Sequence, residues 1–85
     1  MKISEAERMR VAEVAARVAV DTDDLQHPGP RKMKIATAAG MRELKRLERA
    51  EPLRGGCTCP PEFWKALRTV LVIAIEAAVQ AIRRV

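Results

Sequence analysis

The residues most able to do chemistry are basic side chains concentrated between positions 31 and 54. This segment holds eight Lys and Arg against three Asp and Glu, so its net charge is as large as the +5 of the whole chain. If residues 31–50 form one helix, six of these cations lie on or beside the side opposite the leucines, because successive residues turn by about 100°. The six are Arg31, Lys34, Arg42, Lys45, Arg46 and Arg49.

A stripe of cations on a helix can have three roles. It can bind an acidic protein surface, neutralise the phosphates of a nucleic acid and release counterions, or stay solvated and keep the protein soluble. Between the two binding roles, we predict contact with a protein partner and keep nucleic-acid binding as the alternative.

Residues 11–25 carry a second pattern that bears on nucleic acids. Its apolar positions are Ala15, Val18, Val20 and Leu25. This spacing resembles the first helix, the turn and the start of the second helix in bacterial helix-turn-helix DNA-binding domains, which implies a helix that enters a DNA groove. Ala19 stands where that family usually has glycine. Asp23 and Asp24 would repel the DNA phosphates, so the sequence departs from the family in the part that should bind.

Metal and catalytic chemistry would depend on very few residues. Cys57 and Cys59 are separated by one residue, whereas zinc ribbons usually separate their cysteines by two. His27 is the only histidine, so a four-ligand site would have to be shared across an oligomer. Ser4 is the only serine, and the glycine pair at 55–56 lacks the spacing of a phosphate-binding loop. We therefore predict no metal, no cofactor, no small-molecule substrate and no enzymatic activity.

The elements that position these residues can be placed by their end signals. Ser4 and Glu7 have the spacing of a capping box, which predicts a helix start. Pro28 and Pro30 interrupt the chain, and Gly40 predicts a kink or break in the basic helix. The chain therefore divides into a helix at about 5–20, a turn at 21–30, a basic helix at about 31–50, a Gly-, Cys- and Pro-containing loop at 51–61 and an apolar helix at 62–85.

The last predicted helix is apolar on most sides. Its polar residues form one narrow stripe of Lys65, Thr69, Glu76, Gln80 and Arg83. Such a helix must be buried on several sides, and a chain this short can hardly cover about 36 Å of it. We predict a homo-oligomer with this helix at its centre, packed against the alanine rows of the first helix; an ordinary core helix of a monomer is the alternative. The expected interface residues are Trp64, Leu67, Val70, Leu71, Ala74, Ala77, Ala78 and Ala81.

Signals for export and membranes are missing. Glu5 and Glu7 follow Ile3 too closely for the apolar run of a secretory signal. Glu76 would lie near the middle of any membrane span formed by the last helix. Two cysteines without an export signal favour a reducing compartment. We expect a cytoplasmic protein without membrane contact.

The composition sets the fold class. The 85 residues are 48% hydrophobic and 32% charged, as in one small globular domain. With 2% aromatic residues, the chain lacks a stacking platform for single-stranded nucleic acid. We predict an all-α fold, in which residues 1–85 form one small bundle of three main helices plus a short helical turn, completed by oligomerisation. It would be a regulatory subunit or adaptor that self-associates and binds a protein partner through its basic helix or its Cys-Pro loop.

Overall fold

Three α-helices account for most of the described chain. The computed structural model describes residues 2–23, 29–53 and 60–83, and contains no strand in these ranges. Helix α1 spans Glu5–Asp23, α2 spans Gly29–Ala50 and α3 spans Pro61–Arg83. The all-α prediction with three helices is confirmed. The short helical turn expected near residues 25–26 lies outside the described residues.

The helix starts follow their sequence signals closely. At α1, the Ser4 N–H donates to Glu7 Oε1 over 2.9 Å, and the Glu7 N–H donates to Ser4 Oγ over 3.2 Å, so the predicted capping box is present. Helix α2 starts two residues before its predicted start, which puts Pro30 in its first turn, where a missing N–H costs no helical hydrogen bond. Helix α3 starts at Pro61, one residue early.

Helix α1 continues past its expected end at residue 20 and includes Asp23. Val18 and Ala19 are still buried there, so packing outweighs the weak unfavourable effect of carboxylates at a helix C-terminus. The helix-turn-helix interpretation is therefore wrong, because the residues expected to form the turn, from Ala19 onward, continue α1 to Asp23. Val20, an expected apolar core position of that motif, is 58% exposed.

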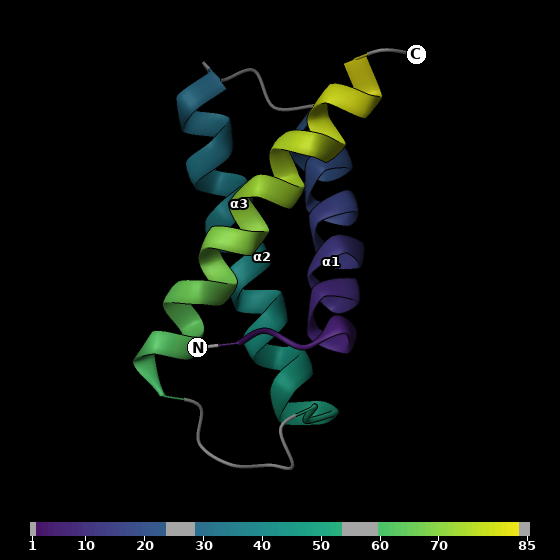
Figure 1. Cartoon of the computed structure of the whole chain (residues 1–85). Coiled ribbons are helices and arrows are strands. Elements are labelled where there is room, and N and C mark those ends of the chain that lie inside the picture. The colour runs from purple at the N-terminus through teal and green to yellow at the C-terminus, as the bar shows by residue number, and fades with distance from the viewer. Residues whose placement is uncertain (1, 24–28, 54–59, 84–85) are drawn as a thin grey trace.

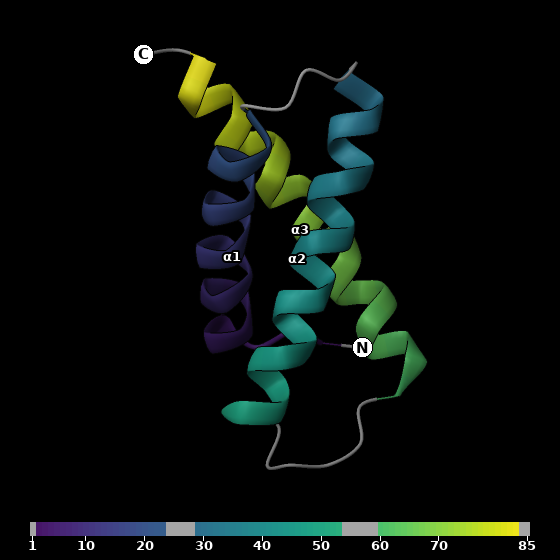
Figure 2. The ribbon, with the colours of Figure 1, turned by 180° about the vertical axis from the view of Figure 1, so that it is seen from behind.

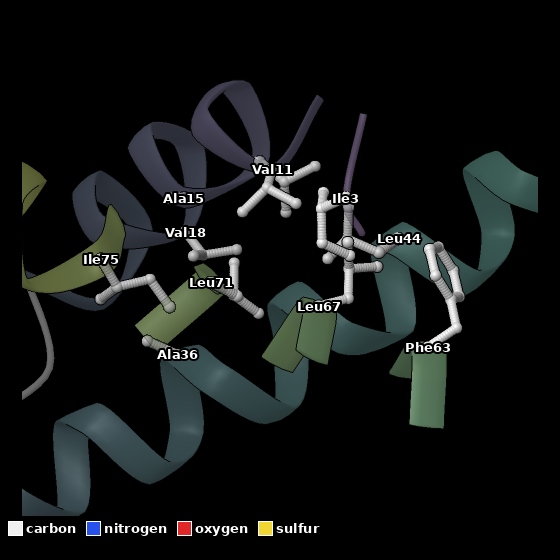
Figure 3. Close-up of a cluster of buried hydrophobic side chains, with 11 residues drawn as sticks. Ile3, Val11, Ala15, Val18, Ala36, Leu44, Phe63, Leu67, Leu71 and Ile75 are labelled. Carbon is white, nitrogen blue, oxygen red and sulfur yellow. The ribbon is translucent and has the colours of Figure 1, made fainter. Parts of the chain in front are cut away.

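The helices run up, down and up, so α1 and α3 are parallel to each other and α2 is antiparallel to both (Figure 1). Helix α3 crosses the other two and packs more extensively against α1 than against α2. Seen from behind, α2 lies in front of α3 and α1 lies to one side (Figure 2). All three helices contribute to one core, together with the N-terminal Ile3 (Figure 3). The buried apolar residues are Ile3, Val11, Val14, Ala15, Val18, Ala19, Ala36, Leu44, Phe63, Leu67, Leu71 and Ile75.

Gly40 allows α2 and α3 to approach closely. It is buried, and α2 continues through it without the expected break. A Cβ atom at Gly40 would lie 2.8 Å from Leu71 Cδ2 and 3.2 Å from Leu71 Cδ1, much closer than carbon atoms normally pack. Leu71 is completely buried at this crossing. The glycine therefore makes room for a core leucine instead of breaking the helix.

Candidate functional site

The six cations predicted as contact residues are all exposed on α2. The opposite side of the helix is buried through Ala36, Gly40 and Leu44. The division follows from helical periodicity, because apolar side chains recurring every three or four residues face the core and leave the remaining positions in water. Arg31, Lys34, Arg42, Lys45, Arg46 and Arg49 thus share the solvent side of α2, as the sequence suggested.

Lys45 connects this charged side of α2 with α3. Its Nζ atom lies 5.7 Å from the centroid of the Trp64 ring, a cation–π contact. Trp64 in turn packs edge-on against the buried Phe63, with ring centroids 5.2 Å apart and an interplanar angle of 64°. The ring of the half-buried Trp64 therefore packs against the ammonium group of Lys45, one of the six cations.

Helix α3 adds two cations that the sequence analysis did not assign to this region. Arg68 is exposed and lies one turn after Trp64 and one turn before Leu71, both of which face α2. Lys65 is exposed on the same flank, three residues before Arg68. We define the basic surface as Arg31, Lys34, Arg42, Lys45 and Arg49 of α2 with Lys65 and Arg68 of α3. In the sequence, the signal for Arg68 was its spacing of four residues from Trp64. This spacing places Arg68 near α2 only once α3 is known to pack beside α2.

Arg46 differs from the other five predicted cations because it is paired. Its Nε atom donates to Glu43 Oε2 over 3.1 Å, and its Nη2 atom pairs with Glu43 Oε1. The Glu43 carboxylate also lies 3.8 Å from Arg17 Nη1 of α1. The hydrogen bond from Arg46 holds the pKa of Glu43 below its ordinary value, and the same bond raises the pKa of Arg46. Arg46 thus belongs to an ion-paired edge between α1 and α2.

Arg10 forms a second ionic link between α1 and α2. Its Nη1 atom lies 3.2 Å from Glu48 Oε2, and its Nη2 atom donates to the Glu51 carbonyl over 2.7 Å. Both charged side chains are largely shielded, with 14% and 13% exposure. Glu51 directly follows the last residue of α2, so the guanidinium hydrogen-bonds a carbonyl just beyond the helix end, where helical N–H donors are no longer available. The adjoining cavity, lined in part by Phe63 and Leu67, has about 10 Å³, so this cluster is structural.

The residues predicted as an oligomer interface are divided between the core and the surface. Leu67 and Leu71 are buried within the single chain, whereas Ala77 and Ala81 are exposed. Between these extremes, Trp64, Val70, Ala74 and Ala78 are half-buried. Helix α1 shows the same division, because one alanine row (Ala15, Ala19) is buried and the other (Ala12, Ala16) is exposed.

Exposed apolar side chains accompany the outward alanines on both α1 and α3, and on α1 the exposed Glu13 lies among them. On α1, Arg10 and Arg17 reach α2, so Ala12 and Ala16 lie on the side towards α3, whereas Met9 and Val20 point outward. On α3, Trp64 and Leu71 face α2, so the flank opposite to them lies beside α1. We define the apolar surface as Met9, Ala12, Ala16 and Val20 of α1 with Ala66, Val70, Ile73, Ala77 and Ala81 of α3.

The described residues also bear on metal ligands and membrane spans. Within residues 2–23, 29–53 and 60–83, no three His, Cys, Asp or Glu side chains gather as they would around a metal ion. His27, Cys57 and Cys59 lie outside these ranges. None of the helices, as far as they are described, has the length and apolar character needed to cross a membrane. In comparisons with known proteins, the chain matches no family model, no curated protein and no solved structure.

Proposed function

We propose that this chain is a non-enzymatic binding module that self-associates and binds an acidic protein partner through its basic surface. One observation carries the proposal: seven cations on the solvent side of α2 and the adjoining flank of α3 are exposed, and none pairs with a carboxylate of the described residues. Arg10, Arg17 and Arg46, by contrast, each pair with a glutamate. The module would serve as an adaptor or regulatory subunit.

The distribution of the cations favours a protein over a nucleic acid. Arg31 and Lys34 lie at one end of α2, and Arg42 begins a second group about 12 Å further along the helix axis. The exposed Ala38 lies between them. An acidic amphipathic helix can place two groups of carboxylates over the cations and an apolar side chain over Ala38. Duplex DNA presents a charge about every 1.7 Å along its axis, and its phosphates over the gap would stay solvated and add nothing to binding.

The aromatic residues support the same choice. Single-stranded nucleic acid binds by stacking its bases on open aromatic faces. Phe63 is buried, and Lys45 lies over the ring of the half-buried Trp64. These are the two aromatic residues that the sequence contains. Carboxylates need only the cations, and each exposed pair contributes up to about 1 kcal/mol, so binding has to use several of them together.

The proposal can be tested with Trp64 fluorescence, because Trp64 is the only tryptophan. The full chain is titrated with a Glu-rich amphipathic helical peptide and, separately, with a DNA duplex of equal charge, at 50 and 200 mM NaCl. We expect the peptide to bind more tightly than the duplex. Its carboxylates would draw Lys45 away from the indole ring and change the emission.

A pair of double variants with equal charge changes provides the control. Arg42→Glu with Arg49→Glu alters the basic surface, and Arg17→Glu with Arg46→Glu alters the ion-paired edge. The first pair should weaken peptide binding by about 100-fold, since two attractive contacts become repulsive, and the second by less than about threefold. Equal losses in both would show that net charge alone is responsible and contradict the proposal. Tighter binding of the duplex would favour the nucleic-acid alternative.

A further inference from the structure

Two half-buried apolar side chains, Met41 of α2 and Trp64 of α3, lie among the cations of the basic surface. Both pack against the hydrophobic core, and part of each remains exposed. Electrostatic contact with an acidic partner makes no use of them. Tryptophan is enriched among the residues that dominate binding at protein interfaces, so a tryptophan beside several cations points to a contact site.

Two contacts align α2 with α3 in this region. Gly40 packs on Leu71, and Lys45 lies over Trp64. The two helices are antiparallel (Figure 1), so the residues that follow Gly40 in α2 lie at the level of those that precede Leu71 in α3. The stretch between the two contacts is between about one and two helical turns long.

Met41 and Arg68 lie in this stretch. Met41 precedes Lys45 by four residues, and Arg68 follows Trp64 by four residues. This spacing places each pair on one face of its helix, so both pairs lie on the side of the crossing where Lys45 meets Trp64. We define the seam site as Met41, Lys45, Trp64 and Arg68, which combines one apolar side chain and one cation from each helix.

We infer that the seam site receives one aliphatic side chain of the acidic partner helix, while carboxylates on either side of it pair with Lys45 and Arg68. The inference rests on the proposed function and names the feature by which the partner is selected. A carboxylate that draws Lys45 away from the indole ring uncovers the ring for the partner's side chain. Methionine is unbranched and flexible, so Met41 can adjust to the inserted group.

The expected partner has a defined sequence pattern. On a helix, residues three and four positions from a leucine lie on the same face as the leucine, so glutamates at these positions can reach the two cations. Exposed ion pairs each contribute little to binding, whereas an apolar side chain contributes in proportion to the area that leaves water. The seam site should therefore discriminate between acidic helices of equal charge.

Two fluorescein-labelled helical peptides of equal charge test the seam site. Both are rich in glutamate and carry glutamates three residues before and four residues after a central position, which is leucine in one peptide and glutamine in the other. Fluorescence anisotropy with the full chain, under reducing conditions at 50 mM NaCl, gives the two dissociation constants. We expect the leucine peptide to bind at least tenfold more tightly, because its apolar side chain leaves water.

Met41→Gln and Met9→Gln form a matched pair of variants, because the same substitution falls on the seam site in one and on the exposed outer side of α1 in the other. Met41→Gln should weaken binding of the leucine peptide at least fivefold and of the glutamine peptide less than twofold. Met9→Gln should change neither by more than twofold. Circular dichroism checks that both variants remain helical. A general loss of folded protein would weaken both peptides equally, so the difference between them reports the coupling of Met41 to the leucine.

The outcomes separate the seam site from the basic surface. Equal binding of the two peptides to the wild type would overturn the seam site and leave charge-dependent binding by the basic surface intact. The same conclusion would follow if Met41→Gln weakened both peptides equally or neither of them. If neither peptide bound the wild type, the proposed function would be contradicted and the seam site with it.

Discussion

The basic surface and the apolar surface lie on opposite flanks of α3. They differ in the free energy that it costs to leave their side chains exposed to water. Arg68 and Lys65 on the flank beside α2 are fully compatible with water. Ile73 and Ala77 on the flank beside α1 leave apolar area exposed, at about 25 cal/mol per Å². The first surface can therefore remain free between binding events, whereas the second is stabilised by being covered. The comparison separates a surface that selects partners by charge from one that selects them by shape.

This difference predicts different responses to the same perturbation. Charge contacts at the protein surface act over about 8 Å at physiological salt and speed up encounter more than they hold a complex together. Apolar contacts require close fit over the whole area and respond weakly to salt. Helix α3 contributes residues to both surfaces. Both surfaces therefore depend on the packing of its buried side, at Leu71.

The largest effect is expected at the inner side of α3. Leu71 is completely buried against Gly40, so Leu71→Ala should lower the free energy of unfolding by about 3 kcal/mol through the cavity it leaves. Ile73→Ala, two residues away and 63% exposed, should cost less than about 0.5 kcal/mol in a monomeric sample. Urea denaturation at low protein concentration measures both. Similar losses would contradict the division of α3 into a buried and an exposed side.

Salt should distinguish the two surfaces next. Raising NaCl from 50 to 500 mM should weaken binding of the Glu-rich peptide about tenfold, equivalent to about 1.4 kcal/mol, because the exposed charges are screened. The dissociation constant for self-association should change by less than twofold over the same range, since apolar burial does not depend on charge. Fluorescence titration and sedimentation give the two constants. Parallel salt dependence of both would show that the surfaces do not differ as described.

The capping box at the start of α1 should contribute to the stability of the fold. Ser4→Ala removes the hydroxyl that accepts the Glu7 N–H and should cost about 1 kcal/mol of stability. Thr69→Ala is the control, because the Thr69 hydroxyl donates to the Lys65 carbonyl within an already hydrogen-bonded helix, and its loss should be close to neutral. Thermal unfolding compares the two. An equal loss in Thr69→Ala would indicate a general effect of losing a hydroxyl instead of a cap.

The smallest effect concerns the ion-paired edge between α1 and α2. The hydrogen bond from Arg46 keeps the pKa of Glu43 below its ordinary value of 4.5. A lowered carboxyl pKa in the folded state stabilises the fold above pH 4.5, and this contribution is lost as the pH falls through the lowered pKa. The difference in melting temperature between wild type and Glu43→Gln should therefore be small at pH 7 and disappear towards pH 3. A difference that grows on acidification would contradict this sign.

Much of the fold could be predicted from local signals. The capping box at Ser4, the proline at residue 30 and the start of the apolar run at residue 62 placed the three helix starts to within two residues. The end of α1 was misplaced because the burial of Val18 and Ala19, which extends the helix, depends on tertiary contacts. The expected kink or break at Gly40 was wrong for the same reason. Helix propensity alone predicts that a glycine weakens the helix, and only the position of Leu71 explains why a glycine is required there.

The candidate surfaces were predictable in part. The cations of α2 could be found by counting charges along one helix. The contribution of Arg68 could not, because it depends on how α3 packs beside α2. The pairing of Arg46 depends on Glu43 and on Arg17 from another helix. The apolar excess of α3 predicted burial on several sides, whereas within the chain Leu67 and Leu71 are buried and Ile73 and Ala77 are exposed. The sequence did not distinguish these two groups.

The link formed by Arg10 has a consequence for the kinetics of folding. Arg10 contacts Glu48 and Glu51, which lie 38 and 41 residues further along the chain. Contacts of this separation pay a large loop-closure entropy, so we expect them to form after the helices have docked. Removing a late contact speeds unfolding and leaves the folding rate nearly unchanged. Arg10 should therefore lengthen the lifetime of the folded bundle and contribute little to how fast the bundle assembles.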